Sequence, residues 1–90
     1  MRVKYLKVDS ELAERVGWDS AALYAFLRMR HSTLRRDDRG YFLMDAKYVE
    51  RGIGMDRFRF IRCRNKLARE GLILCEHGAN QNNKSRYKLL

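Results

Sequence analysis

The chain has 90 residues, of which 46% are hydrophobic, enough for one domain with one core and too many for a disordered chain. Its 20 Lys and Arg outnumber 11 Asp and Glu, and the resulting net charge of +9 fits a polyanionic partner such as DNA, RNA or an anionic membrane surface. No long apolar run and no secretory signal is present, so the sequence excludes a membrane-spanning helix and predicts a cytoplasmic protein.

The first half of the chain predicts two helices and two short strands. Residues 2–8 alternate polar and apolar side chains, which is typical of a short edge strand. Asp9 or Ser10 is placed to cap a short helix over residues 11–16, which Gly17 ends. A longer helix is expected over residues 20–35, where apolar residues including Leu23 and Leu34 share one stripe. A short strand follows at residues 41–44.

Three segments open with the same pattern, an aspartate between two apolar residues. Asp19, Asp45 and Asp56 each follow an apolar residue and precede another by four positions. Aspartate is a favoured N-cap, and the apolar pair matches a hydrophobic staple. The pattern therefore predicts helix starts at residues 20, 46 and 57, with the last two helices covering residues 46–52 and 57–70.

The C-terminal segment predicts a β-hairpin. Gly71 follows the last helix as a natural C′ residue. Residues 72–75 and 86–90 have strand character, and the polar residues 77–84 form the loop between them. The whole order predicts one α+β domain over residues 1–90. We expect a winged helix-turn-helix with a three-helix core, a short N-terminal strand and helix, and a C-terminal β-hairpin wing.

The helix expected over residues 57–70 carries the predicted chemistry. Phe60, Cys63 and Leu67 share its inner face at helical spacing, and a basic stripe lies beside them. Arginine pairs bidentately with phosphates and with the guanine edge in the major groove, so we predict that this helix docks into duplex DNA. A basic face that only contacts solvent is the alternative. The expected DNA-binding residues of the helix are Arg57, Phe58, Arg59, Arg62, Lys66 and Arg69.

Phe58 has three candidate roles. It can touch a thymine methyl group, join a dimer interface or pack in the core, and core packing is the role we expect. The hairpin adds Lys84, Arg86 and Lys88, which are two residues apart and therefore project from one face of an extended strand. We predict that Lys84 and Arg86 contact the DNA backbone, with a polar turn that binds nothing as the alternative.

The segment from Asp45 to Ile73 resembles the winged helix-turn-helix modules of plasmid and phage replication initiators and of DnaD-type primosome proteins. The matching motifs are the turn Ile53-Gly54-Met55, the cap Asp56, the helix exit Arg69-Glu70-Gly71-Leu72-Ile73 and the wing strand Ser85-Arg86-Tyr87-Lys88-Leu89. Small accessory proteins of conjugation relaxosomes and ordinary repressors look similar. The resemblance implies double-stranded DNA binding in replication, DNA transfer or transcriptional control. Two positions depart from the pattern: Arg64 stands where the family usually has an apolar residue, and Gly52 beside Gly54 is expected to loosen the turn.

Nothing in the sequence indicates an enzyme, a metal site or a cofactor. His31 and His77 belong to no metal-binding or nucleophile pattern, and we expect both at the surface. Cys63 and Cys75 form neither a disulfide framework nor a Cys-x-x-Cys pair, so we expect buried, reduced thiols. The alternative function is a protein-interaction module that binds an acidic partner through the same basic helix, and double-stranded RNA ranks third. A homodimer on repeated half-sites stays open.

Overall fold

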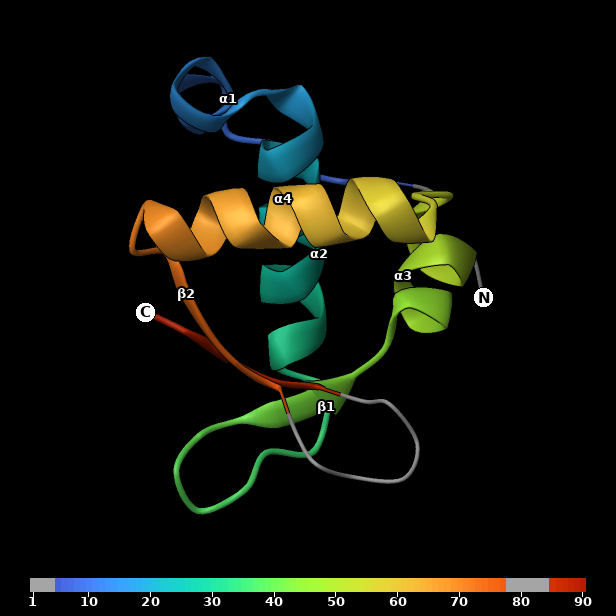
Figure 1. Ribbon diagram of the computed structural model, residues 1–90, viewed down its shortest axis with the longest axis vertical. Coiled ribbons are helices and arrows are strands. Elements are labelled where there is room, and N and C mark those ends of the chain that lie inside the picture. The colour runs from blue at the N-terminus through green and yellow to red at the C-terminus, as the bar shows by residue number, and fades with distance from the viewer. Residues whose placement is uncertain (1–4, 78–84) are drawn as a thin grey trace.

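The structure, a computed structural model, describes residues 5–77 and 85–90 (Figure 1). Within these ranges it has an α+β fold of four helices and one three-stranded antiparallel sheet, a layout compatible with a winged helix. The elements are α1 (Ser10–Val16), α2 (Trp18–His31), β1 (Phe42–Met44), α3 (Ala46–Ile53), α4 (Arg57–Arg69), β2 (Ile73–His77) and β3 (Ser85–Leu89).

The predicted N-terminal strand is wrong over its described part. Residues 5–8 belong to no strand, and residues 2–4 lie outside the described residues. Leu6 and Val8 pack against the hydrophobic core as single side chains instead. The strands of the described residues form one sheet of order β1-β3-β2, and residues 5–8 do not pair with any of them.

Aspartate caps three of the helices, but not all the predicted ones. The carboxylates of Asp45 and Asp56 accept hydrogen bonds from the backbone N–H of Tyr48 and Arg59, both at 2.8 Å, as predicted. Asp9 caps α1 in the same way. The predicted cap at Asp19 is wrong, because α2 already begins at Trp18.

The start of α2 is set by Gly17. This residue has a φ of 90° and serves as both the C-cap of α1 and the N-cap of α2. The φ lies in a region that favours glycine, and it lets the chain turn between two helices within a single residue. Asp19 therefore falls in the first turn of α2, where a carboxylate still stabilises the positive end of the helix.

The end of α2 also differs from the prediction. The helix stops at His31 rather than near residue 35. The hydroxyl of Thr33 donates to the carbonyl of Arg30 at 3.0 Å, and that of Ser32 donates to Met29 at 3.4 Å. Such local bonds compete with helix continuation. Leu34 nevertheless packs against the core from the segment that follows.

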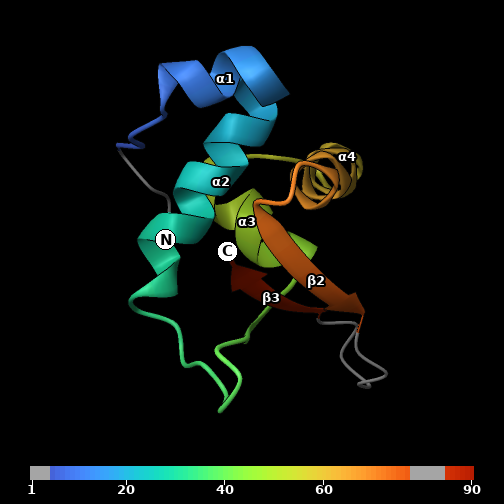
Figure 2. The same ribbon diagram turned by 90° about the vertical axis from the view of Figure 1, so that its left-hand side faces the viewer.

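The core lies between α2 and the elements around it. Figure 2 shows α2 at the centre, with α1 above it, the sheet below it and α4 alongside, seen along its axis. Phe26 on α2, Leu67 on α4 and Tyr87 on the central strand β3 are all fully buried. Both edge strands pair with β3, so that Phe42 and Cys75 flank Tyr87 in register. This core fixes which side of α4 faces inward.

The extra glycine in the turn region has a packing role. Gly52 is buried in α3, and a Cβ added there would lie 2.5 Å from Cζ of Phe26. Gly54, by contrast, is the left-handed C-cap of α3 with a φ of 70°. The sequence alone suggested that two glycines loosen the turn. In the structure, Gly52 allows α3 to approach α2 closely, and only Gly54 shapes the turn.

Candidate nucleic-acid interface

The long basic helix α4 crosses in front of α2 and lies at the outside of the molecule (Figure 1). It begins at Arg57 because Asp56 caps its first turn. Phe60, Cys63 and Leu67 are buried, which confirms the predicted inner face. The opposite side of α4 is therefore free to contact a partner.

The outward stripe of α4 runs through side chains at positions 58, 62, 65 and 69, all of which are exposed. These positions repeat at intervals of four and three residues, so they lie on one face opposite the buried stripe. Phe58 is 83% exposed, and the expectation that it packs in the core is wrong. It lies two residues before the buried Phe60, which turns its side chain away from the core. Arg62, Asn65 and Arg69 complete the stripe.

One flank of α4 faces the start of α2. Nε of Arg59 lies 3.6 Å from a carboxylate oxygen of Asp19, and both side chains are about half exposed. An exposed pair of this kind contributes less than about 1 kcal/mol. A shallow hollow of about 420 Å³ runs along this flank, lined by Arg62, Lys66 and Arg69 and by Trp18, which is 65% exposed. The predicted stripe of Arg59, Arg62 and Lys66 thus leans towards this flank rather than pointing straight out.

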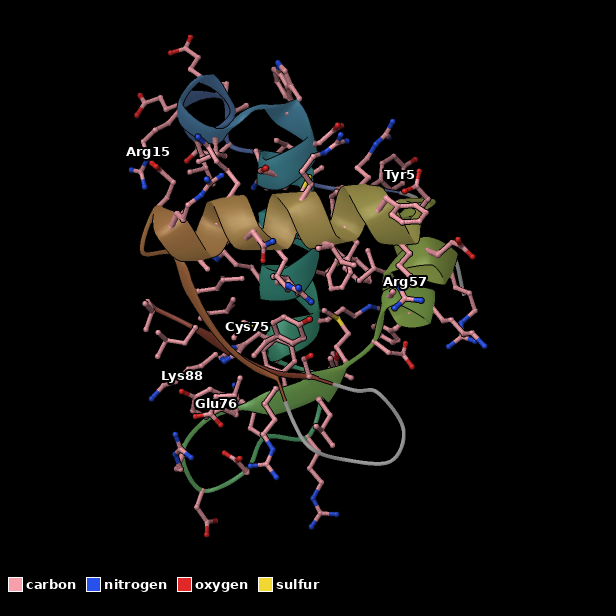
Figure 3. All side chains as sticks on the ribbon, in the orientation of Figure 1. Tyr5, Arg15, Arg57, Cys75, Glu76 and Lys88 are labelled. Atoms are coloured by element: carbon pink, nitrogen blue, oxygen red, sulfur yellow. The ribbon has the colours of Figure 1, made fainter. Side chains whose placement is uncertain are left out.

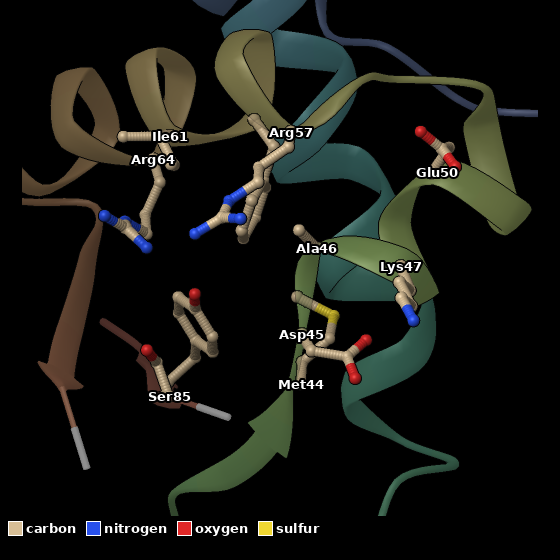
Figure 4. Close-up of a pocket in the computed structure, with 11 residues that line it drawn as sticks. Met44, Asp45, Ala46, Lys47, Glu50, Arg57, Ile61, Arg64 and Ser85 are labelled. Carbon is tan, nitrogen blue, oxygen red and sulfur yellow. The ribbon is translucent and has the colours of Figure 1, made fainter. Parts of the chain in front are cut away.

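The other flank of α4 faces α3 and the sheet across a pocket of about 490 Å³ (Figure 4). Arg57 and Arg64 reach into this pocket from α4. Lys47 comes from the first turn of α3, and Ser85 and Tyr87 come from β3. Sequence reasoning placed Arg57 at the groove-facing end of the helix and did not select Arg64 or Lys47 as site residues.

Arg64 is held by aromatic neighbours. Its guanidinium lies 5.6 Å from the ring centroid of Phe60. Its Nε atom is buried and has no hydrogen-bond partner in the described part of the chain. Burial raises the pKa of Tyr87 to about 12, and hydrogen bonding with Arg64 only partly opposes this shift. Tyr87 is therefore a neutral hydroxyl at pH 7 and places no negative charge beside Arg64.

The wing strand β3 presents its basic residues on the face of the sheet opposite Tyr87. Arg86 is exposed and lies between Leu43 and Glu76 of the neighbouring strands. Lys88 is half-buried, with Nζ 5.8 Å from the ring centroid of Tyr41. The predicted alternation is confirmed for these two residues. Lys84 lies outside the described residues.

Several arginines outside α4 and β3 have clear partners within the fold, while Arg28, Arg35 and Arg51 are exposed. Arg39 donates to a carboxylate oxygen of Glu76 at 2.8 Å and lies 4.8 Å from the ring centroid of Tyr41. The guanidinium of Arg30 lies over the rings of Phe26 and Tyr48, at 5.7 and 5.8 Å from their centroids. Figure 3 shows that Arg57 projects beside α3, far from Glu76 and Lys88 on the sheet. Arg30 and Arg39 therefore have contacts within the fold, whereas the outward arginines of α4, at positions 62 and 69, have no ion-pair partner that the described residues supply.

Other chemistry-bearing groups form no second site. Cys63 is buried and Cys75 half-buried, both are free thiols, and burial raises the pKa of each. His31 packs edge-on against Phe42, and burial together with Arg36 lowers its pKa. Among residues 5–77 and 85–90, no three His, Cys, Asp or Glu side chains gather where a metal ion could bind. No helix within those ranges is long and apolar enough to cross a membrane.

Comparison with known proteins identifies no relative. No protein family, no curated protein and no solved structure matches the chain.

Proposed function

We propose that this protein is a non-enzymatic winged helix-turn-helix domain that binds duplex DNA with α4 in the major groove. The observation that carries the proposal is the uncovered cationic face of α4. Within the described residues, no carboxylate pairs with Arg62, Lys66 or Arg69, although 11 acidic residues are present in the chain. A cationic helix of this kind supplies the charge that attracts and positions a nucleic-acid backbone.

The arrangement around α4 supports the same proposal. A tight turn of three residues joins α3 to α4, and the paired strands β2 and β3 follow directly. With 13 residues, α4 is about 20 Å long, and the major groove is about 12 Å wide and admits one helix. The order α2, β1, α3, α4, β2, β3 and the strand order β1-β3-β2 suit a winged helix.

The outward stripe suggests a division of roles. Arg62 and Asn65 have the side chains that pair with guanine and adenine edges, respectively. Phe58, exposed at the leading end, is placed to touch a thymine methyl group. Lys66 and Arg69 would contact flanking phosphates, as would Lys84 and Arg86 of the wing. The biological setting we propose is plasmid or phage replication, DNA transfer or transcriptional control.

A second candidate is a protein-interaction module for an acidic partner. The observation that favours it is the exposure of two large aromatic side chains near the basic face, Phe58 at 83% and Trp18 at 65%. Exposed aromatic residues beside arginines are typical of the centre of protein interfaces. The two candidates differ in how binding responds to salt and to the nucleic acid offered.

The test is fluorescence anisotropy with a random 20-base-pair DNA duplex across a NaCl series. Three or more phosphate contacts predict a log–log slope of about −2.7 or steeper, since each contact contributes roughly 0.9. Arg62→Gln should weaken binding by about 1–3 kcal/mol. Arg28→Gln is the matched control, because it removes the same charge from an exposed position on α2 and not from α4.

Two results would reject the proposal. Absence of DNA binding at low salt would favour the acidic protein partner. Equal affinity for an A-form RNA duplex would contradict groove docking, since the narrow major groove of RNA does not admit a helix.

A further inference from the structure

The pocket between α4, the N-terminus of α3 and the sheet has two arginines at one end. It has a volume of about 490 Å³, and two arginines from one helix, Arg57 and Arg64, line it. They are seven residues apart, which is two helical turns, so both lie on the same flank of α4. In Figure 4 the guanidinium groups of both point into the same end of the pocket. No carboxylate within the described residues forms an ion pair with either.

The two carboxylates that line the pocket do not neutralise these arginines. Asp45 and Glu50 lie on the side of α3, and the ammonium group of Lys47 is drawn beside the carboxylate of Asp45 (Figure 4). One oxygen of Asp45 is already committed to the backbone N–H of Tyr48 at 2.8 Å. The lining carries three cations against two carboxylates, and the positive charge is concentrated at the Arg57–Arg64 end.

The neighbouring groups suit a tetrahedral oxyanion. The Nε–H of Arg64 is buried without a hydrogen-bond partner, a donor left unsatisfied at a cost to the folded state. The Tyr87 hydroxyl stays neutral because its pKa is about 12, so it does not repel an anion.

We infer that this pocket binds one phosphate group, clamped between Arg57 and Arg64. The two non-bridging oxygens of a backbone phosphate each have several lone pairs and lie on a tetrahedral centre, so one phosphate can accept hydrogen bonds from both guanidinium groups at once. The inference rests on the proposed function for the source of the phosphate, which is the DNA backbone beside the groove that receives α4. In this inference Arg64 binds a backbone phosphate, so its contribution to affinity does not depend on the base sequence.

The test measures salt slopes for random duplex DNA with single and double variants. Arg57→Gln and Arg64→Gln should each weaken binding roughly tenfold or more, because each removes a charged hydrogen bond. Each should also make the slope shallower by about 0.9, the amount for one phosphate. The double variant should lose the same 0.9 and not twice that amount, because both arginines hold a single phosphate.

Controls separate binding from folding. Arg57 is exposed, so Arg57→Gln should fold normally, and Arg28→Gln removes the same charge elsewhere and should leave the slope unchanged. Arg64→Lys keeps the charge but loses the fork, and should retain the slope while losing affinity. Thermal unfolding followed by circular dichroism identifies any Arg64 variant that fails to fold. In that case the salt slope of Arg57→Gln alone tests the inference.

A second arm separates the sources of phosphate. Titration with inorganic phosphate at constant ionic strength, followed by NMR of the arginine Nε–H groups, should shift the Arg64 resonance in the wild type but not in Arg57→Gln. If DNA does not bind but this shift is seen, the proposed function fails and the pocket takes a free phosphate. If DNA binds and neither the slope of Arg57→Gln nor the Arg64 resonance changes, the pocket inference is overturned and DNA binding stands. A double variant that loses about 1.8 in slope would overturn the single shared phosphate.

Discussion

Gly52→Ala offers a direct test of how α3 packs on α2. In an exposed helix the same change stabilises by about 0.5–1 kcal/mol, because alanine has less backbone freedom to lose. Here the new methyl group would lie 2.5 Å from Cζ and 2.6 Å from Cε1 of Phe26. Both distances are far below van der Waals contact, and Phe26 is fully buried. The ring or the helix must therefore move.

The magnitude follows from two opposing contributions. Overpacking a tight core costs about 1–3 kcal/mol, and the gain in helix propensity returns up to about 1 kcal/mol. We expect a net loss of about 1–2 kcal/mol in the free energy of unfolding. For a domain of this size that corresponds to a melting temperature lower by about 4–16 °C.

Urea unfolding followed by circular dichroism measures this loss, and a double-mutant cycle identifies its cause. Phe26→Leu removes the ring edge that the methyl group meets. The two substitutions should therefore be coupled, and Phe26→Leu should cost at least about 1 kcal/mol less in the Gly52→Ala background than alone. A rise in stability for Gly52→Ala would refute the packing argument, because propensity alone would then decide. The packing argument would also be refuted if the losses in unfolding free energy from the two substitutions were additive.

Three further predictions concern the surface and pH. Asp19→Asn frees Arg59, so affinity for random DNA should rise severalfold at low salt and the log–log slope should steepen; an unchanged slope would place Arg59 away from the DNA. Phe58→Ala should change stability by less than about 0.5 kcal/mol, since the side chain is 83% exposed, and a melting curve that drops sharply would contradict its outward position. The pKa of Tyr87 is raised by burial from 10.0 to about 12, so stability is fully present below pH 10 and should fall by roughly 3 kcal/mol between pH 10 and 12. Tyr87→Phe should remove most of this fall and Tyr5→Phe should not, which urea unfolding at each pH would establish.

Features set by neighbouring residues could be predicted from the sequence. Asp45 and Asp56 cap their helices through bonds to N–H groups three residues ahead, so the signal and its consequence lie in one short segment. The inner face of α4 follows from its apolar spacing alone. Asp19 had the same local pattern, yet the helix start moved because Gly17 serves two helices at once. The start of α2 is therefore set by where α1 ends, and the residues around Asp19 alone do not contain that information.

Features set by packing between elements could not be predicted. The spacing of Phe60 with Cys63 and Leu67 predicts its inward position, but the exposure of Phe58 depends on which elements pack against α4, and none of the described elements covers it. The orientation of Arg64 depends on β3, and the pairing of Arg59 depends on where α2 begins. Arg64 did carry one sequence signal, its position where an apolar residue is usual. The structure accounts for it, since Arg64 borders the core and opens onto a pocket.

The acidic residues show why the charge of the domain is concentrated on α4. Seven of the 11 have a structural partner in the described residues: Asp9, Asp45 and Asp56 cap helices, Asp37 holds a turn, and Asp19, Glu70 and Glu76 pair with arginines. A capping carboxylate points at backbone N–H groups and cannot also neutralise an arginine on the outer face. Like charges left at i, i+4 spacing, as at Arg62 and Lys66, lower helix stability by a few tenths of a kcal/mol, about 0.2–0.5 per pair. This cost is offset only when phosphates replace the counterions around the helix. At the basic end of α2 and in its following turn, Arg30 is stacked and Arg39 is paired, while Arg28, Arg35 and Arg36 are exposed. Because α4 gathers six Lys and Arg within 13 residues, it is the face that we expect to meet DNA.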